Sequence, residues 1–318
     1  MAGKVVVIGD GNVGKALSFA IFIKGVAKEL AIIDLDFKKV GGDVLDLIHG
    51  SPFVPDIKVK VGSYADCKDA AVIAIAVNPV GAAFPKDRNE LLVSNLRLMK
   101  GILPKIKANL NPSAKVLLIT NPVDSMAFFA SKVLGLPANQ VIGSGTVLDS
   151  SRFKVGLSAR LGVSVKDIDA YVVGEHGNSE VPVFSSAMIG GTRLDHYLHD
   201  NGKSIDRKEV WEEVVKGGFT VGAGKGCTNY AIALSATRII EALQDEQPSL
   251  LPVSSFMGAY EGVRQDIYMS LPALVNDRGV LKIIGVDMDG REEEALAQSE
   301  SVLSDLSKTV SSFANPAY

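Results

Sequence analysis

Short apolar runs alternate with segments of helical spacing along the first half of the chain. The runs have the length and β-branched content of buried strands, and they lie at residues 4–8, 30–33, 57–61, 71–77, 116–120 and 141–143. Between them, apolar residues recur at intervals of three and four, as in residues 38–49 and 89–108, which indicates helices. Strands that alternate with crossover helices are typical of a parallel, doubly wound sheet. The pattern therefore predicts an α/β fold with such a sheet over residues 1–145.

The pattern changes at residue 146, beyond which longer helices are mixed with shorter strands such as residues 170–173. We therefore place a second, α+β domain at residues 146–318. The last segment, residues 291–313, is charged and has apolar positions at Ala295, Val302 and Leu306. This spacing predicts an amphipathic helix that lies on the core.

A glycine-rich turn follows the first predicted strand with no linker, and it reads Gly9-Asp10-Gly11-Asn12-Val13-Gly14. In a G-x-G-x-x-G turn the first glycine makes the bend, the second admits a pyrophosphate, and the third lets helix and strand pack closely. Glycine-rich turns also close ordinary strand–helix junctions. With its strand and helix in place, this one predicts a Rossmann dinucleotide site formed by Gly9, Gly11, Asn12, Val13 and Gly14.

An acidic residue, Asp34, ends the second apolar run, 20 residues beyond Gly14. A carboxylate at this offset binds the ribose hydroxyls of an adenosine. The same carboxylate would repel the additional phosphate of NADP. The sequence therefore predicts NAD as the cofactor, with an exposed acid at a strand end as the alternative for Asp34 alone.

Composition narrows the class of protein. The 318 residues are 47% hydrophobic, which is enough to form a sizeable core. Their net charge of −3 argues against nucleic-acid binding, which requires clustered positive charge. The apolar run at residues 71–77 is far shorter than a bilayer span, and the first strand begins too early to leave room for a signal peptide. Cys67 and Cys227 lack metal-ligand spacing, as do His196 and His199, so we expect no metal site and a reducing, cytoplasmic location.

Two further stretches carry candidate catalytic groups. His176 lies in Gly-Glu-His-Gly at the end of a short apolar strand, where small neighbours leave an imidazole accessible for acid–base chemistry. Asp149 and Arg152 lie three residues apart on one helix face, so Asp149 could orient His176 while Arg152 grips a substrate carboxylate. A surface ion pair is the alternative for these two residues. Arg88 closes a Gly- and Pro-containing loop that could fold over a substrate.

The order of these motifs resembles the L-lactate and malate dehydrogenase family over essentially the whole chain. The matching stretches are GxGxxG, the loop arginine, Thr-Asn-Pro-Val-Asp, Gly-Ser-Gly-Thr-x-Leu-Asp-x-x-Arg and Gly-Glu-His-Gly. The resemblance implies that His176 takes the hydroxyl proton while hydride passes between the substrate and NAD. It also implies roles for Asp149 in orienting His176, for Arg152 and Thr228 in binding substrate, and for Arg88 in polarising the carbonyl. Asn121, before a proline that is cis in the family, would bind near the reacting centre and the cofactor.

The loop ahead of Arg88 departs from both main branches of the family. Residues 77–86 contain neither the additional arginine that malate dehydrogenases direct at a distal carboxylate nor the glutamine of lactate dehydrogenases. The loop is apolar and slightly longer, and with Gly-Glu-His-Gly-Asn-Ser it most resembles the L-2-hydroxyisocaproate dehydrogenases. The sequence therefore predicts an L-2-hydroxyacid dehydrogenase that accepts larger aliphatic side chains. Lactate dehydrogenase and malate dehydrogenase are the alternatives, and Lys86 could still attract a dicarboxylate.

A protein of a different class could keep this fold, namely an NAD-binding structural or regulatory protein without activity. The joint presence of His176, Asp149, Arg152 and Arg88 argues against that hypothesis. We expect a small 2-oxo or 2-hydroxy monocarboxylic acid as the partner, with no nucleic acid and no membrane. The resemblance further implies a homo-oligomer, either a tetramer or a dimer.

Overall fold

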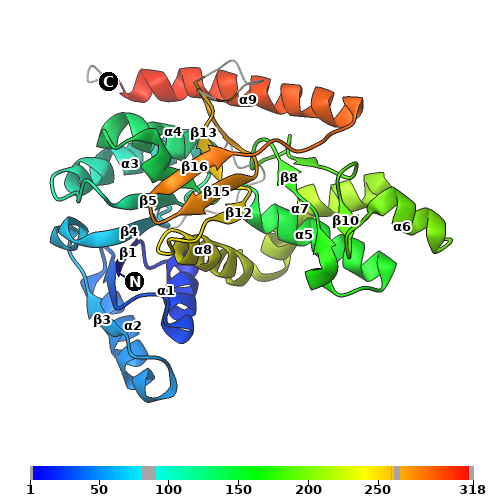
Figure 1. The fold of residues 1–318 in the computed structure, drawn as a ribbon. Coiled ribbons are helices and arrows are strands. Elements are labelled where there is room, and N and C mark those ends of the chain that lie inside the picture. Colours follow the sequence, from blue (N-terminus) through cyan, green and yellow to red (C-terminus); the bar gives the residue numbers. More distant parts are fainter. Residues whose placement is uncertain (1–2, 80–90, 259, 261–265, 315–318) are drawn as a thin grey trace.

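A computed structural model describes residues 3–79, 91–258, 260 and 266–314 of the chain (Figure 1). The elements of its first half are β1 (Lys4–Ile8), α1 (Asn12–Lys24), β2 (Glu29–Ile33), α2 (Phe37–His49), β3 (Lys58–Val61), β4 (Ala70–Ile75), α3 (Leu92–Lys107), β5 (Lys115–Leu118), α4 (Val123–Leu134) and β6 (Val141–Gly143). The apolar runs and helical segments that the sequence predicts there correspond to these elements, with ends that differ by a few residues.

The second half has longer helices and many short strands. Its helices are α5 (Val147–Leu161), α6 (Leu194–Asp200), α7 (Arg207–Lys225), α8 (Tyr230–Ala242) and α9 (Gly290–Ala314). Its strands are β7 (Ile168–Asp169), β8 (Val172–Val173), β9 (Val181–Pro182), β10 (Met188–Ile189), β11 (Thr192–Arg193), β12 (Ser249–Leu251), β13 (Ser254–Phe256), β14 (Tyr268–Ser270), β15 (Ala273–Asn276) and β16 (Gly279–Ile283).

The main sheet of the described residues has the order β14-β13-β6-β5-β4-β1-β2-β3. Strands β1 to β6 pair in parallel, and the order reverses between β1 and β4. In a doubly wound sheet, this reversal opens a crevice at the carboxyl ends of the strands, where dinucleotides bind. The glycine-rich turn follows β1 and therefore stands at that crevice.

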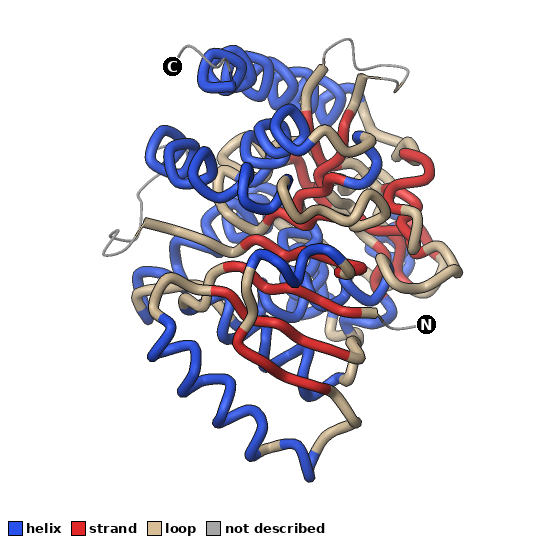
Figure 2. Tube along the Cα trace, turned by 90° about the vertical axis from the view of Figure 1, so that its left-hand side faces the viewer, coloured by secondary structure: helices blue, strands red, loops and turns tan. Residues whose placement is uncertain are grey.

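Helices cover both faces of the parallel sheet, as Figure 2 shows with strands in red and helices in blue. Alternate residues of each strand point to opposite faces. Val6 and Ile8 of β1 belong to the core under α3, α4 and α9, whereas Val5 and Val7 belong to the core under α1, α2 and α8. Because both faces are buried, these strands are continuously apolar rather than alternating. The predicted doubly wound fold is confirmed.

The division that the sequence suggests at residues 145 and 146 does not interrupt the sheet. β13 and β14 come from the second half, and β13 pairs antiparallel with β6. The predicted strand at residues 170–173 is replaced by β7 and β8, which belong to two different small sheets. The structure also places α9 along the core, with Val310 fully buried. None of the helices in the described part of the chain has the length and apolarity needed to span a bilayer.

Helix α1 exposes two of its large apolar residues. Phe19 and Ile23 are 56% and 45% exposed. Leu17, Ile21 and Phe22 are buried instead. Helix α1 is apolar on nearly all sides, so its periodicity alone does not identify the side that packs on the sheet.

Candidate active site

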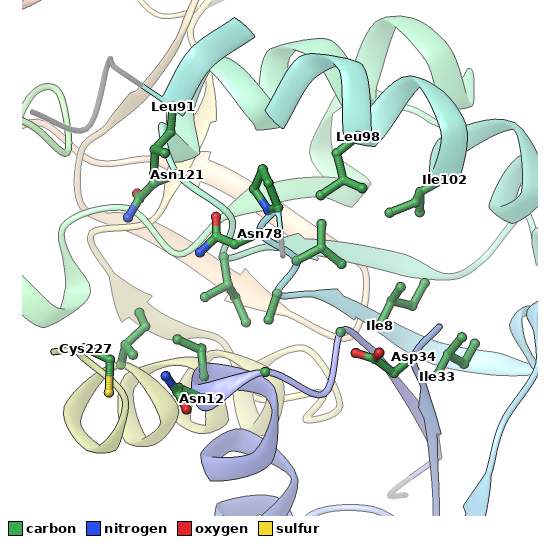
Figure 3. Close-up of a pocket in the computed structure, with 18 of the residues that line it drawn as sticks. Ile8, Asn12, Ile33, Asp34, Asn78, Leu91, Leu98, Ile102, Asn121 and Cys227 are labelled. Carbon is green, nitrogen blue, oxygen red and sulfur yellow. The ribbon is translucent and has the colours of Figure 1, made fainter. Parts of the chain in front are cut away.

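A cavity of about 910 Å³ runs along the crevice of the main sheet (Figure 3). At one end it is lined by the glycine-rich turn and by Asp34, which ends the β2 segment. At the other end it reaches Arg152 and His176 from the second half of the chain. The cavity thus joins the predicted dinucleotide site to the predicted catalytic residues.

The glycine-rich turn is built so closely that side chains would not fit. Gly9 has a φ of +100°, and a Cβ there would lie 2.5 Å from the carbonyl oxygen of Ala76. A Cβ on Gly14 would lie 1.7 Å from the carbonyl oxygen of Gly9, so this glycine lets α1 approach the strand. Gly11 has nothing within 4 Å of a Cβ position and lines the cavity with Asn12 and Val13. The open backbone at the N-terminus of α1 suits a pyrophosphate.

The carboxylate of Asp34 is fixed by backbone donors. Its Oδ2 accepts from the N–H of Asp10 at 2.6 Å, and its Oδ1 accepts from the N–H of Asp36 at 3.1 Å. Burial raises the pKa of Asp34, but these hydrogen bonds outweigh burial, and the pKa lies below its usual range. Asp34 therefore presents a negative charge at the cavity at neutral pH, which fits a ribose diol and not an additional phosphate.

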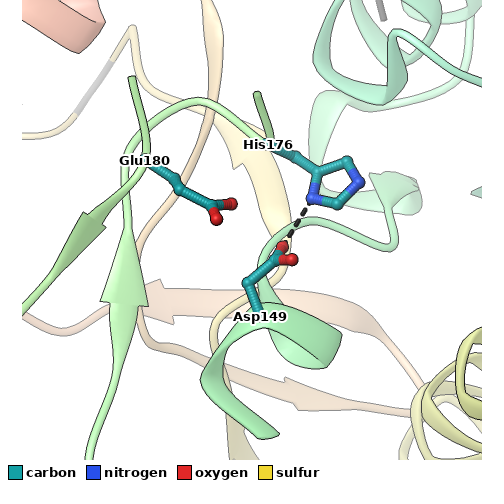
Figure 4. A group of neighbouring side chains, drawn as sticks. All are labelled: Asp149, His176 and Glu180. Carbon is teal, nitrogen blue, oxygen red and sulfur yellow. Dashed lines mark hydrogen bonds and ion pairs between the residues drawn. The ribbon is translucent and has the colours of Figure 1, made fainter. Parts of the chain in front are cut away.

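The centre of the catalytic end is a buried pair formed by His176 and Asp149 (Figure 4). Nδ1 of His176 lies 2.5 Å from Oδ2 of Asp149, which has no exposed surface. Asp149 is in the first turn of α5, where the helix dipole favours a negative charge. The predicted partnership between these two side chains is therefore present in the geometry.

Arg152 shares the same carboxylate. Its guanidinium lies 2.5 Å from Oδ1 of Asp149, one helical turn earlier on α5, and it lines the cavity beside His176. A cation and an imidazole are thus held on the two oxygens of one buried acid. The alternative of a surface ion pair does not hold, since Asp149 is fully buried.

Of the remaining predicted site residues, two lie at the cavity and one lies outside the described part of the chain. Asn121 and Thr228 both line the cavity, and the Asn121–Pro122 peptide bond is cis. The backbone carbonyl of Asn121 accepts from Asn95 Nδ2 at 2.6 Å, while its Oδ1 is buried with no hydrogen-bond partner among the described residues. A substrate or cofactor group could satisfy that oxygen. Arg88 and most of its loop, including Lys86, lie outside the described residues.

Two acidic residues near His176 did not emerge from the sequence as site residues. Glu180 is fully buried, and it lies with Asp149 and His176 in a group whose ligand-type atoms are all within 4.8 Å of one another. Such groups can bind a cation, but the Asp149 carboxylate is already hydrogen-bonded by His176 and Arg152. We therefore interpret the group as a proton-transfer site. Asp124 is the second residue, and its side chain reaches the backbone of His176.

The two cysteines differ in their surroundings. Cys67 is buried, and burial raises the pKa of its thiol to about 12. Cys227 is only half-buried and lines the cavity next to Thr228. Sequence spacing could not reveal this position, because Cys227 lies in the segment between α7 and α8.

Two family models match the chain in sequence. The lactate/malate dehydrogenase NAD binding domain matches residues 3–143, and the lactate/malate dehydrogenase alpha/beta C-terminal domain matches residues 146–314. L-lactate dehydrogenase of Priestia megaterium is 37% identical over 304 residues, with 94% of each chain covered. L-lactate dehydrogenase of Clostridium perfringens is 34% identical over 303 residues, covering 94% of this chain and 95% of that one.

Solved structures of lactate dehydrogenases are also similar to this chain in fold. A lactate dehydrogenase from a Medee basin deep-sea metagenome library superposes with a TM-score of 0.91 at 30% identity, covering 98% of this chain and 99% of that one. The minor L-lactate dehydrogenase of Enterococcus mundtii gives 0.90 at 30% identity, covering 97% and 98%. None of these four relatives is named a hydroxyisocaproate dehydrogenase, so they favour the lactate alternative. The chain belongs to the lactate/malate dehydrogenase family of oxidoreductases, and its first half is the NAD-binding domain of that family.

Proposed function

We propose that this chain is an NAD-dependent L-lactate dehydrogenase that interconverts L-lactate and pyruvate. One observation carries the proposal: the buried Asp149 carboxylate holds both His176 and Arg152 at the end of a cavity that begins at the dinucleotide turn. An acid–base group and a carboxylate-binding cation at one place are what a 2-hydroxy acid requires. The relatives named L-lactate dehydrogenase support pyruvate as the main 2-oxo acid.

In this proposal, each residue of the group has a separate task. NAD, when bound, would accept the hydride that leaves C2 of lactate. His176 takes the hydroxyl proton on Nε2, and ionised Asp149 at Nδ1 stabilises the imidazolium that forms. Arg152 binds the substrate carboxylate through the guanidinium edge that Asp149 leaves available.

The other site residues position the substrate and the cofactor. We assign Asn121 and Thr228 to hydrogen bonds with substrate, since both line the cavity, and Arg88 to polarising the carbonyl, as in the family. Gly9, Gly11, Asn12, Val13 and Gly14 would receive the pyrophosphate, and Asp34 the adenosine ribose. We retain residues 1–145 and 146–318 as the cofactor-binding and catalytic parts of the chain.

A second candidate is a preference for larger 2-oxo acids. Gly217 and Gly218 occupy the middle of α7, and Gly218 lines the cavity, whereas a Cβ on Gly217 would lie 2.9 Å from Arg152 Cδ. A glycine in a helix interior costs about 1 kcal/mol relative to alanine, so Gly217 indicates a need for space beside Arg152 and Gly218 a need for space at the cavity. Each additional buried methylene of a substrate would contribute about 0.8 kcal/mol to binding. This observation, with the apolar loop at residues 77–86, favours 2-oxoisocaproate as an additional substrate.

A panel of 2-oxo acids tests both candidates. We expect NADH oxidation, followed at 340 nm, to give the largest kcat/KM with pyruvate, and measurable turnover with 2-oxoisocaproate and phenylpyruvate. Oxaloacetate should be poor, because the loop ahead of Arg88 carries no second arginine. Dominance by oxaloacetate would indicate a malate dehydrogenase, dominance by 2-oxoisocaproate would favour the second candidate, and inactivity with all four would support a non-catalytic NAD-binding protein.

We also propose that copies of this chain associate. Several large apolar side chains are exposed on α1, α2 and α8, namely Phe19, Ile23, Phe37, Leu45, Ile48, Tyr230 and Leu234. Helix α1 packs against both α2 and α8, so these side chains lie on neighbouring helices. Several large exposed apolar side chains on neighbouring helices are typical of a protein–protein interface. A second copy should cover it, as in the family, and light scattering that gives the mass of a single 33.6 kDa chain would contradict this.

A further inference from the structure

Asp124 ties two parts of the candidate active site together. It lies in the first turn of α4, two residues beyond the cis Asn121–Pro122 bond, and only 3% of it is exposed. Its Oδ2 accepts a hydrogen bond from the backbone N–H of His176 at 2.8 Å. The residue that begins α4 is thus joined directly to the main chain that bears the imidazole.

Other main-chain bonds also hold the turn around His176. The N–H of Glu175 donates to Ser299 Oγ on α9 at 2.6 Å, and the N–H of Gly174 donates to the carbonyl of Ser270 on β14 at 2.8 Å. The bond between Gly177 N–H and the Glu175 carbonyl, at 2.9 Å, is internal to the turn. The Asp124 bond ties the His176 main chain to α4, while the His176 side chain is held separately by Asp149 on α5.

We propose that Asp124 is a positioning residue for the reaction: by accepting from the His176 backbone, it sets the imidazole against the segment that carries Asn121. This inference rests on the proposed function, because it concerns the geometry in which His176 exchanges a proton with substrate. A displacement of about 1 Å in a reacting group can cost about 100-fold in rate. The role requires only an acceptor oxygen at this place.

The charge of Asp124 adds a second, separable effect. Burial raises the pKa of Asp124 to about 7; the nearby Ser254 hydroxyl and the hydrogen bond from the His176 N–H oppose this, and the Glu175 and Asp149 carboxylates add to it. Below pH 7 the group is mostly neutral, and above pH 7 it is mostly ionised. An ionised Asp124 adds negative charge beside the catalytic pair and so favours the imidazolium. Among the charged groups of the described residues, Asp149, through which Arg152 acts, and Glu180 also lie near the His176 imidazole.

Three variants of the full-length protein separate these effects in steady-state pyruvate reduction. In Asp124→Ala the acceptor is lost, and kcat/KM should fall about 100-fold while the Kd for NADH, measured by fluorescence, stays within about twofold. In Asp124→Asn the amide oxygen still accepts, so kcat/KM at pH 6.5 should return to within about fivefold of wild type. Ser254→Ala is the matched control, because it changes the surroundings of the Asp124 carboxyl group and keeps the hydrogen bond from the His176 N–H. The kcat/KM of this variant should stay within about threefold of the wild-type value.

The dependence of kcat/KM on pH provides a second measurement, which should not change if Asp124 only stabilised the fold. Pyruvate reduction needs protonated His176, so its kcat/KM falls as pH rises. In Asp124→Asn the negative charge above pH 7 is absent, and this fall should begin at a lower pH, by roughly half a unit. Wild-type kcat/KM in Asp124→Ala, or equal losses in the Ala and Asn variants, would overturn the proposal. If the Ala variant does not fold, Asp124→Leu, which is close to aspartate in shape and has no acceptor, takes its place, and wild-type kcat/KM in Asp124→Leu overturns the proposal.

Failure of the proposed function would look different. In that case the wild-type protein would reduce none of the four 2-oxo acids. The hydrogen exchange of the His176 backbone amide, followed by NMR in wild type and Asp124→Ala, then tests Asp124 without turnover. Faster exchange in the variant is expected, because the amide loses its acceptor, and an identical exchange rate would refute the inference.

Discussion

Replacing His176 with alanine is expected to lower kcat for pyruvate reduction by about 10²–10⁴-fold, the contribution of a positioned general acid. The imidazole is held at Nδ1 by the buried Asp149 and borders the cavity, so it is placed to exchange a proton with a substrate there. The dinucleotide turn lies at the other end of the cavity, and NADH should therefore bind with unchanged affinity. Stopped-flow measurement of a single turnover, together with NADH fluorescence titration, checks both statements.

His199 provides the control for this substitution. It lies on α6 with a side chain that is 89% exposed, paired only with the neighbouring Asp200 among described contacts. His199→Ala removes an imidazole of the same size without approaching the cavity, and its kinetics should equal those of wild type. Retention of more than about a tenth of wild-type kcat in His176→Ala would mean that this histidine is not the proton-transfer group.

Replacing Arg152 with lysine should raise the KM for pyruvate by about 10- to 100-fold, although the charge is kept. A guanidinium is planar and has donors on two edges, so one edge can bind Asp149 while another binds a substrate carboxylate in a bidentate way. An ammonium group has no such fork, and Asp149 would compete for its donors. The binding of oxamate, a pyruvate analogue, to the complex with NADH should weaken by the same factor.

Arg160 is the matched position for this test. It lies on the same helix, α5, and pairs with Glu213 at 2.9 Å on the protein surface, where ion pairs contribute little. Arg160→Lys should leave KM and kcat unchanged. If the Arg152→Lys and wild-type proteins had the same KM for pyruvate, Arg152 would not be the residue that binds the substrate carboxylate.

The sequence was most informative where local chemistry is restrictive. The Gly9 turn requires a backbone that other residues rarely adopt, and its glycines, together with the flanking strand and helix and with Asp34, predicted the dinucleotide crevice. The i,i+3 spacing of Asp149 and Arg152 placed both on one helix face. Their meeting with His176 was expected only as a possibility, because residues 27 positions apart along the chain can be brought together only by the fold.

Other features depend on tertiary contacts that local patterns do not contain. β13 and β14 have three residues each, and no alternation distinguishes them from loop. Glu180 follows the Gly-Glu-His-Gly stretch closely but gave no spacing signal. Asp124 gave a weak signal in the sequence, because an acidic residue at the start of the mostly apolar helix α4 could have indicated a buried polar partner. The substrate preference suggested by residues 77–86 depends on a segment that lies mostly outside the described residues.

The antiparallel strands that complete the main sheet have a consequence for how the molecule can be divided. A fragment truncated after residue 145 would leave β6 as an open edge, since β13 would no longer pair with it. It would also strip α8 and α9 from the two faces of the parallel sheet. Unpaired backbone and bare apolar surface promote aggregation. The two halves are therefore expected to unfold in one cooperative transition, with neither half autonomous.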